Sequence, residues 1–433
     1  MGTLLAKLAA IWRGVDHPFL IDGHGALMFR DVAAHDAVDL SPVREGEVVA
    51  LVGDFDAASI LTLLRLIDLG VVIVPLTEAT SAQHAYFFDA ALVDWVVRGG
   101  HLLRRTHAHS HPLIERLRSF GNAGLVLFST GATGRPKAIL HDMTLFLQRF
   151  DTPRPTLRTL SFLLFDHIGG LNTLLHTLFN RGVVIAPPAR TVSAVLRACA
   201  DHAVEVLPTT PTFLRMVLIS GAVPEQVPAT LKLITYGTER MDQPTLNALC
   251  GLLPGVDFRQ TFGMSELGIV RVRSEARDSL YMQVGGEGVD TRVVDGVLQI
   301  RSATRMLGYL NAPSPFNDAG WYDTKDVVEC KPGGWCKVVG RISDVINVGG
   351  LKFMASEVER VALAFPNVSL VKAQPRANPI TGQHVELTVQ ATDAHVLDKD
   401  ALLQFMREQL QPHMVPRRVR LEAVDVGHRF KRA

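Results

Sequence analysis

Short runs of β-branched residues alternate with helical patterns along most of the chain, and this alternation limits the fold more than any other feature. It begins with Val48–Val52, continues with a helical pattern over Ala57–Asp68, and returns to a β-branched run at 71–75. The same order recurs in the segments 183–187, 191–201, 204–207 and 231–236. Strands that alternate with helices predict largely parallel sheets with helices on both faces. The sequence therefore predicts an α/β fold.

The character of the chain changes near residue 285. Val289–Val294, 297–301 and 337–339 are short strand-like runs separated by Asp-Gly and Pro-Gly-Gly turns. They predict a small β-barrel-like part at the end of a large N-terminal domain. A further α+β unit follows, with a helix that begins near Ser356. Because 433 residues exceed the usual size of one domain, we expect an N-terminal domain over 1–340 and a small mobile C-terminal domain over 341–433.

The balance of charge and the hydropathy of the chain indicate which classes of binding partner are not expected. The chain has 44 Lys+Arg against 43 Asp+Glu and no basic run, so neither nucleic acid nor an anionic membrane is expected. The most apolar stretch, 60–76, is interrupted by Arg65 and Asp68, and the first residues lack the order of a signal peptide. We therefore expect a cytoplasmic protein with free thiols and no cysteine metal site. The cysteines are scattered at Cys199, Cys250, Cys330 and Cys336.

The segment Ser129-Thr-Gly-Ala-Thr-Gly-Arg-Pro-Lys137 holds three hydroxyl side chains, two glycines and a lysine within nine residues. It follows an apolar run, 124–128, that is typical of a buried strand. Glycines let backbone N–H groups turn toward an anion, hydroxyls add donors, and the lysine adds a positive charge. The lysine follows a proline, which excludes a Walker A loop. The segment predicts a site for a polyphosphate, although alone it would more often be an ordinary turn.

Polar segments downstream carry the other groups that a nucleotide site needs. Glu266 is a carboxylate beside a hydroxyl, and near a triphosphate it is suited to Mg²⁺, which prefers oxygen ligands. Asp326 and Arg341 offer an acid and a guanidinium for ribose hydroxyls and phosphate. Gly349 and Gly350 form a turn where another group can approach the backbone closely. Taken singly, each has an ordinary alternative, a surface or capping carboxylate or a hairpin turn.

Together and in this order, these segments resemble the adenylate-forming superfamily, which includes acyl- and aryl-CoA ligases, firefly luciferase and the adenylation domains of peptide synthetases. The resemblance runs from about Val48 to the C-terminus. Residues 129–137 are similar to the family's phosphate loop, although Ala132 and Ala138 depart from the usual Ser/Thr and Gly. In the segment that resembles Trp-Tyr-x-Thr-Gly-Asp, Lys325 replaces the glycine.

The resemblance implies ATP and Mg²⁺ as cofactors, with Glu266 as the magnesium ligand. It implies Asp344 as the pivot of a hinge, and a channel for the thiol arm at Gly349, Gly350 and Lys352. The residues that it implies for ATP or AMP binding are Ser129, Thr130, Gly131, Thr133, Gly134, Lys137, Tyr236, Gly237, Thr238, Phe262, Ser265, Asp326 and Arg341.

His167 and Asp166 bear on which class of carboxylic acid the protein is expected to bind. His167 matches the histidine that many CoA ligases of the family place beside the substrate carboxylate, whereas peptide synthetases keep an aspartate in this region. Asp166 adjoins His167, and the sequence leaves open which of the two faces the substrate. The His-x-x-Gly pattern favours an aryl or acyl acid over an α-amino acid. The expected substrate pocket comprises His167, Gly169, Gly170, Gly237 and Gly263.

The C-terminal tail departs from the family pattern. An essential lysine is expected within Gly-Lys-x-x-Arg, but alignment on Arg432 places Arg429 in that position, and Lys431 lies two residues further on. With Lys431, Arg429 and His167 as catalytic residues, the resemblance implies ATP-dependent conversion of a carboxylic acid to an acyl-adenylate and transfer to coenzyme A. The alternatives are transfer to the phosphopantetheine of an acyl or peptidyl carrier protein, or a catalytically degenerate protein that binds an acyl-adenylate or nucleotide.

Overall fold

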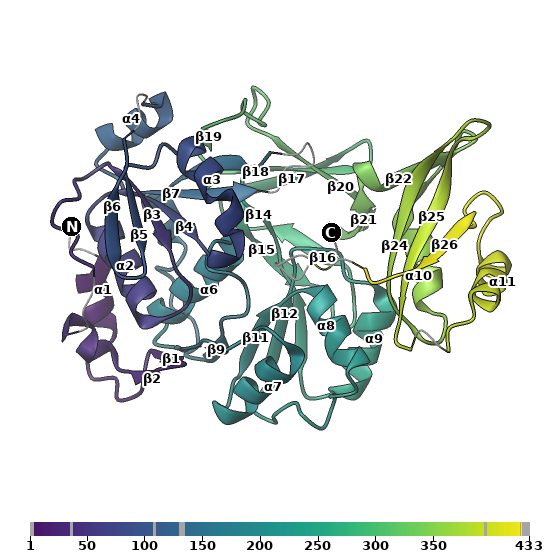
Figure 1. Ribbon diagram of the computed structural model, residues 1–433, viewed down its shortest axis with the longest axis horizontal. Helices are drawn as coiled ribbons and strands as arrows, with labels where there is room; N and C mark the ends of the chain where they lie inside the picture. Colours follow the sequence, from purple (N-terminus) through teal and green to yellow (C-terminus); the bar gives the residue numbers. More distant parts are fainter. Residues whose placement is uncertain are drawn as a thin grey trace.

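The computed structural model describes residues 4–34, 38–106, 110–129, 135–393, 396–424 and 426. Within these residues the chain forms three seven-stranded sheets, followed by a smaller C-terminal part (Figure 1). The α-helices are α1 (Leu4–Ile11), α2 (Ala57–Asp68), α3 (His84–Ala90), α4 (Pro112–Ser119), α5 (Met143–Gln148), α6 (Ile168–Phe179), α7 (Val192–Asp201), α8 (Pro211–Ile219), α9 (Gln243–Leu252), α10 (Ala355–Leu363) and α11 (Lys399–Gln409).

The first two sheets have parallel strands at their centres, as the sequence predicts. The first runs in the order β13 (Asp257–Gln260), β12 (Leu233–Tyr236), β11 (Val206–Thr209), β9 (Arg158–Leu160), β10 (Val183–Ile185), β1 (Leu20–Asp22) and β2 (Gly25–Leu27). The second runs in the order β19 (Gly308–Tyr309), β8 (Lys137–Asp142), β7 (Gly124–Ser129), β4 (Val72–Leu76), β3 (Val48–Val52), β5 (Trp95–Arg98) and β6 (His101–Arg104).

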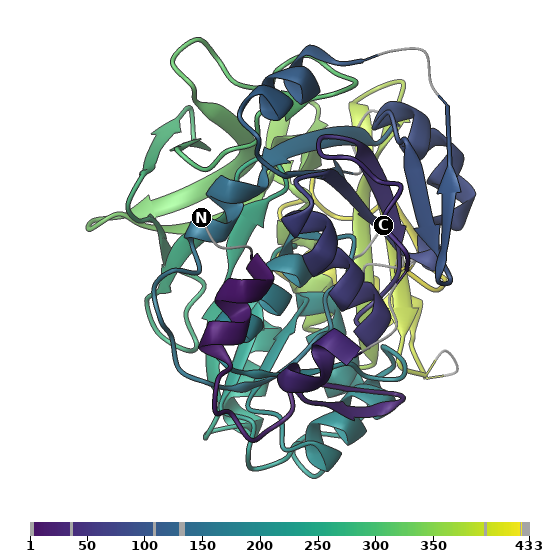
Figure 2. The ribbon, with the colours of Figure 1, turned by 90° about the vertical axis from the view of Figure 1, so that its left-hand side faces the viewer.

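Helices cover both faces of the second sheet because its central strands are apolar on both sides. In β3, Val49 and Leu51 pack into a core that includes residues of α1, α2 and α6, whereas Val48 and Ala50 pack into the core on the opposite face. Asp56 fixes the start of α2 by accepting a hydrogen bond from the backbone N–H of Ser59. Figure 2 shows α1 and α2 on the face turned toward the viewer.

The third sheet is antiparallel, with the order β14 (Phe262–Met264), β15 (Gly268–Ser274), β16 (Met282–Gly285), β21 (Trp335–Arg341), β20 (Tyr322–Lys331), β18 (Val297–Ser302) and β17 (Val289–Val294). The region expected to be small and barrel-like is thus a sheet as wide as the other two. Its strands carry Asp326 and Arg341, so it contributes directly to the predicted nucleotide site.

The C-terminal unit, defined here as residues 345–424, contains a hairpin, a three-stranded sheet and two helices, α10 and α11. Its strands are β22 (Val345–Val348) and β23 (Leu351–Met354), then β24 (Val368–Asn378), β25 (Gly382–Ala391) and β26 (Arg418–Leu421). Its buried hydrophobic core draws all its members from residues 346–419. Figure 1 places the unit at one end of the molecule. A core of its own agrees with the domain boundary predicted at 340–344, which stays a prediction.

One expectation about cysteines is wrong. Cys330 and Cys336 form a disulfide, because the β20–β21 hairpin places them opposite each other. Cys199 and Cys250 are free, as expected. Separately, among the described residues no helix combines the length and apolar character needed to cross a bilayer.

Candidate functional site

Two antiparallel strands hold the ends of the predicted phosphate loop. β7 ends at Ser129, β8 begins at Lys137, and the register places these two residues opposite each other. Between them, the predicted loop residues Thr130, Gly131, Thr133 and Gly134 lie outside the described residues. The position of Lys137 is therefore set by β8, which is buried along most of its length.

Tyr309 joins Lys137 and Glu266, which are far apart in the sequence. β19 pairs with the outer edge of β8 and brings the Tyr309 ring close to Lys137, whose Nζ lies 4.9 Å from the ring centroid. The Tyr309 hydroxyl donates a 2.8 Å hydrogen bond to Oε1 of Glu266. Both side chains are almost fully buried. An ammonium group, a phenol and a carboxylate from distant parts of the sequence thus meet in one corner of the structure.

The protonation states in this corner follow from burial and from the charge of Glu266. Burial first, and then the negative charge of Glu266, raise the pKa of Tyr309 and that of Tyr322 well above their usual range. Both phenols are therefore neutral at physiological pH. A neutral Tyr309 can donate to Oε1 of Glu266, which leaves Oε2 as the carboxylate oxygen for a cation.

His141 fixes the backbone just before Glu266. Its Nε2 lies 2.6 Å from the carbonyl oxygen of Ser265, and the ring is buried. Burial lowers the pKa of His141 to about 4, so the imidazole is neutral at pH 7 and donates its Nε2–H to that carbonyl. The histidine on β8 therefore connects the strand that bears Lys137 to the segment that bears Glu266.

Asp326 and Arg341 face each other across β20 and β21. Nε of Arg341 lies 3.2 Å from Oδ1 of Asp326, whose side chain is 10% exposed, whereas that of Arg341 is 58% exposed. Burial raises the pKa of Asp326 to about 6, although Arg341 acts in the opposite direction. The charges of Glu266 and Asp326 raise the pKa of Tyr322, and that of Arg341 lowers it. The Asp326–Arg341 pair therefore lies near the corner formed by Lys137, Tyr309 and Glu266.

The segment Tyr236–Thr238, which the resemblance implies for ATP or AMP binding, begins at the end of β12. Tyr236 is buried, and a Cβ at Gly237 would lie 2.1 Å from Oγ1 of Thr261, so only glycine fits there. Thr238 then adopts φ 72°, the left-handed region that is unusual for a β-branched residue. A Cβ at Gly263 would lie 2.9 Å from the Gly268 carbonyl oxygen. Close packing therefore accounts for both glycines. Phe262 directly precedes Gly263, and Ser265 follows it by two residues.

His167 caps the N-terminus of α6. Its Nδ1 accepts a 3.1 Å hydrogen bond from the backbone N–H of Gly169, which places the proton of a neutral ring on Nε2. His167 can therefore present an N–H donor on its other side. A Cβ at Gly170 would lie 2.0 Å from the carbonyl oxygen of Leu164, so this glycine is required by the fold. The neighbouring Asp166 is buried.

The predicted hinge lies in a short 3-10 turn, η3 (Ile342–Asp344). The Asp344 carboxylate accepts a hydrogen bond from the backbone N–H of Arg341 at 3.2 Å. Gly349 and Gly350 form the turn between β22 and β23 with φ of 61° and 91°, which favours glycine. This turn and Lys352 are exposed.

Comparisons with known proteins find a family model and distant relatives. A family model described as AMP-binding enzyme matches residues 121–310. The chain is 27% identical over 350 residues to acyl-CoA synthetase FUM10 of Gibberella moniliformis, which covers 69% of this chain and 62% of that protein. It is 26% identical over 274 residues to the medium/long-chain-fatty-acid–[acyl-carrier-protein] ligase FadD10 of Mycobacterium tuberculosis, which covers 55% of this chain and 50% of that protein.

A solved structure agrees. The amide bond synthetase McbA from Marinactinospora thermotolerans superposes with a TM-score of 0.77 at 19% sequence identity, over 99% of this chain and 98% of that one. Residues 121–310 thus match the family of AMP-binding enzymes, and the chain as a whole has the fold of McbA. The matched region is less than two thirds as long as either of the two curated relatives.

The superfamily resemblance led to Lys137, Glu266, Asp326 and Arg341, which the structure brings to adjoining positions. It gave no role to Tyr309, Tyr322 or His141, although Tyr322 lies inside the segment that resembles Trp-Tyr-x-Thr-Gly-Asp. Tyr309 sits in a two-residue strand that no hydrophobic pattern reveals. The expected catalytic residues Arg429 and Lys431 lie outside the described residues, so their role stays a prediction.

Proposed function

We propose that this protein belongs to the adenylate-forming superfamily, uses ATP to convert a carboxylic acid to an acyl-adenylate, and then transfers the acyl group to the thiol of coenzyme A. The observation that carries the proposal is the meeting of Lys137 and Glu266 at Tyr309, beside the Asp326–Arg341 pair. A cation for phosphate, a carboxylate for a metal ion and an acid for ribose hydroxyls are the groups that ATP requires.

Each group then has a chemical role. The carboxylate oxygen of the acid attacks the α-phosphorus of ATP, and pyrophosphate leaves. Lys137 stabilises the negative charge that develops on the phosphate oxygens, because its ammonium is fixed at the start of β8. Asp326 accepts hydrogen bonds from the ribose hydroxyls. His167, with its proton on Nε2, orients the carboxylate of the acid.

Glu266 fits a role as magnesium ligand. Mg²⁺ is usually held by one or two carboxylates together with substrate phosphates, and prefers oxygen ligands. Tyr309 holds Oε1 of Glu266 by its hydrogen bond, which fixes the direction of the remaining oxygen. When bound, the ion would neutralise phosphate charge during the attack.

The substrate class that we propose is an aryl or acyl acid. An α-amino acid would need a carboxylate partner for its ammonium group, and here the position at the start of α6 is occupied by the His167 ring. Asp166 remains the alternative partner for such a group, and substrate screening separates the two.

The acceptor is proposed as coenzyme A, with a carrier protein as the alternative. FUM10 is named an acyl-CoA synthetase and FadD10 an acyl-carrier-protein ligase, so relatives of both kinds support a thiol acceptor. In a second step, attack of the thiol on the acyl carbonyl would expel AMP and form a thioester. The catalytically degenerate alternative rests on Arg429, which stands where the superfamily pattern has lysine.

The proposal is tested by exchange of labelled pyrophosphate into ATP in the presence of pooled aryl, short-chain and medium-chain acids. Exchange that depends on one acid pool would support adenylation and name the substrate class. Lys137→Met and Glu266→Gln should each lower exchange on the order of 100-fold. Nucleotide binding without exchange in any pool would contradict the proposal and favour a binding protein.

A further inference from the structure

One guanidinium beside the largest core has no acidic partner. Arg149 directly follows α5, and its guanidinium lies over the ring of Phe146, 4.6 Å from the centroid. Its Nε is buried without a hydrogen-bond partner, and Nη1 lies 3.5 Å from the carbonyl oxygen of Ile269, at the limit of a hydrogen bond. Among the described residues no carboxylate pairs with Arg149, and burial alone shifts its pKa.

The guanidinium nevertheless carries its charge at neutral pH. Burial lowers the pKa of Arg149 to about 10, which is still well above neutrality. The neighbouring His141 is neutral and offers no compensating charge, and the charge of Arg149 helps to keep it so. The face of the Phe146 ring is a weaker partner for a cation than a carboxylate. Buried charges in proteins are usually paired, so an anion from outside the chain would supply the missing partner.

Arg149 lies next to the hairpin that bears Gly263, a residue of the predicted acid pocket. The register of β14 and β15 pairs Gly263 with Ile269, and a Cβ at Gly263 would lie 2.9 Å from the carbonyl oxygen of Gly268. A Cβ at Gly268 would lie 2.9 Å from Nη2 of Arg149. Gly268 therefore adjoins both Gly263 and the guanidinium. Its φ of 77° favours glycine, and the missing side chain lets the guanidinium approach the hairpin.

An apolar region connects Arg149 to α6, which begins beside His167. Phe146 belongs to the same buried core as Ile168 of α6, and Ile269 packs against that core. Arg149 and the start of α6 therefore border one apolar region, in which charges are poorly screened. An acid whose reacting carboxylate lies at His167 would place its remote end in this region.

We infer that the acid substrate carries a second carboxylate, and that Arg149 binds this group at the end of the pocket remote from His167. The inference rests on the proposed function and names the class of substrate, a dicarboxylic acid. A guanidinium holds a carboxylate by two parallel N–H···O bonds, which give direction as well as affinity. Arg149 is thus a specificity-determining residue and takes no part in the attack on phosphorus.

Selection follows from the same contact. A monocarboxylic acid of equal length would cover the guanidinium with apolar groups and leave its charge without a partner. A site built to pair a polar group rejects an analogue that lacks it, because the buried group then stays unpaired. The second carboxylate should therefore lower KM more than it raises kcat.

The parent protein is tested with pairs of acids that differ in one carboxylate. Succinate, adipate, suberate and isophthalate are compared in turn with butyrate, hexanoate, octanoate and benzoate. Pyrophosphate exchange gives kcat and KM, and titration calorimetry without ATP gives the Kd of each acid. At least one dicarboxylic acid should exceed its partner about 100-fold in kcat/KM, and its Kd should be lower than that of its partner.

Arg149→Met removes the charge and retains an apolar side chain. The KM of the preferred dicarboxylic acid should rise about 100-fold, while monocarboxylic acids should bind as well as before or better. Arg149→Lys keeps a charge without the fork and should retain part of the preference. Because an unpaired buried charge is lost, Arg149→Met should not lower Tm. The matched control is Arg116→Met, since Arg116 also lies over a ring, that of Phe120, but is exposed on α4 and should change nothing measured.

The outcomes separate this inference from the proposed function. Exchange in which no dicarboxylic acid exceeds its partner would overturn the inference and leave the proposed function intact. An equal loss for both kinds of acid in Arg149→Met, with a lower Tm, would show a structural role and also overturn it. Tight binding of a dicarboxylic acid that depends on Arg149, without exchange for any acid, would support the site and contradict the proposed function.

Discussion

Tyr309 illustrates what one side chain contributes to the candidate site. Its ring contacts Lys137 at the start of β8, and its hydroxyl binds Glu266 in the connection between β14 and β15, so it links these two segments. A buried carboxylate that accepts a hydrogen bond from a fixed neutral donor is held in one orientation. Tyr309 therefore acts on the reaction through Glu266.

Tyr309→Phe removes only the hydroxyl. We expect the Mg²⁺ concentration for half-maximal pyrophosphate exchange to rise about tenfold, because the oriented carboxylate loses its supporting hydrogen bond. The free energy of unfolding should fall by about 1–3 kcal/mol, since a buried acceptor loses its donor. Tyr281→Phe is the control, because its hydroxyl binds Glu329 at the exposed surface. Equal Mg²⁺ dependence in both variants would contradict the assignment.

Asp326 predicts a pH dependence. Ribose hydroxyls donate to the carboxylate, and the pKa of Asp326 is raised to about 6 by burial. Below pH 6 the Kd for AMP should therefore rise about tenfold per pH unit, as the carboxylate is protonated. Titration calorimetry from pH 5 to 8 measures this, and Asp326→Asn should bind weakly without that dependence. A constant Kd between pH 7 and 5 in the parent would refute it.

The same pKa shift has the opposite effect on folding. Because the folded carboxyl is protonated more readily than the unfolded one, whose pKa is 3.8, the folded state binds more protons between about pH 4 and 6. The contribution of Asp326 to stability therefore increases as the pH falls through this window. At neutral pH the buried, ionised carboxylate of Asp326 therefore lowers the free energy of unfolding.

Among the elements, the start of α6 is the most tightly constrained. Gly170 contacts the Leu164 carbonyl so closely that a Cβ would lie 2.0 Å from the oxygen, and His167 caps the same turn. The position of the His167 ring therefore depends on the packing of Gly170. Gly170 is therefore required by the packing of the fold, and it affects the predicted pocket only by setting the position of His167.

Gly170→Ala should lower the free energy of unfolding by about 1–3 kcal/mol, because the methyl group forces backbone to move. Urea unfolding measures the change. Gly251→Ala, in α9, is the matched control, since its Cβ would meet nothing within 4 Å and alanine favours a helix by about 0.5–1 kcal/mol. Equal effects of the two changes would show that the contact with Leu164 is not the cause.

The bounds of the helices and strands show how much of the secondary structure could be predicted from the sequence. Val48–Val52 and Ala57–Asp68 were predicted with the bounds that the structure has, because their apolar patterns are continuous and the flanking residues end them clearly. Residues 337–339 were predicted as a short strand but belong to β21, which is longer at both ends. Antiparallel strands half exposed to solvent carry a weaker pattern than buried parallel ones.

Contacts between distant elements left no signal in the sequence. Cys330 and Cys336 looked scattered because the hairpin that pairs them was not recognised. Tyr309 reaches Glu266 only through the pairing of β19 with β8. Arg215 and Arg240 are ordinary arginines in the sequence, and their contacts depend on how the C-terminal unit lies. Local motifs could therefore name the nucleotide residues, but not the side chains that hold them.

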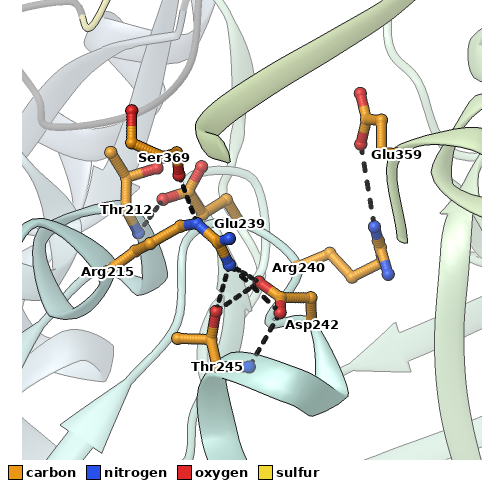
Figure 3. A network of polar contacts seen from close by, with 8 residues as sticks. All are labelled: Thr212, Arg215, Glu239, Arg240, Asp242, Thr245, Glu359 and Ser369. Atoms are coloured by element: carbon orange, nitrogen blue, oxygen red, sulfur yellow. Dashed lines mark hydrogen bonds and ion pairs between the residues drawn. The ribbon is translucent and has the colours of Figure 1, made fainter. Parts of the chain in front are cut away.

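At the scale of the whole molecule, the candidate site is assembled from two sheets. The second sheet supplies Lys137 and Tyr309, and the antiparallel sheet supplies Asp326 and Arg341, while Glu266 lies between β14 and β15. The C-terminal unit contacts the rest of the molecule through the Arg215 hydrogen bond to Ser369 and the Arg240–Glu359 ion pair (Figure 3).

The central claim is that a carboxylate oxygen of the substrate attacks the α-phosphorus of ATP. The most direct measurement supplies the acid found by pyrophosphate exchange with both carboxylate oxygens labelled with ¹⁸O, together with ATP and coenzyme A, and analyses the products by mass spectrometry. Our account predicts AMP that carries one ¹⁸O atom, since the attacking oxygen stays on phosphorus when the thiol expels AMP. Unlabelled AMP, or formation of ADP in its place, would contradict it.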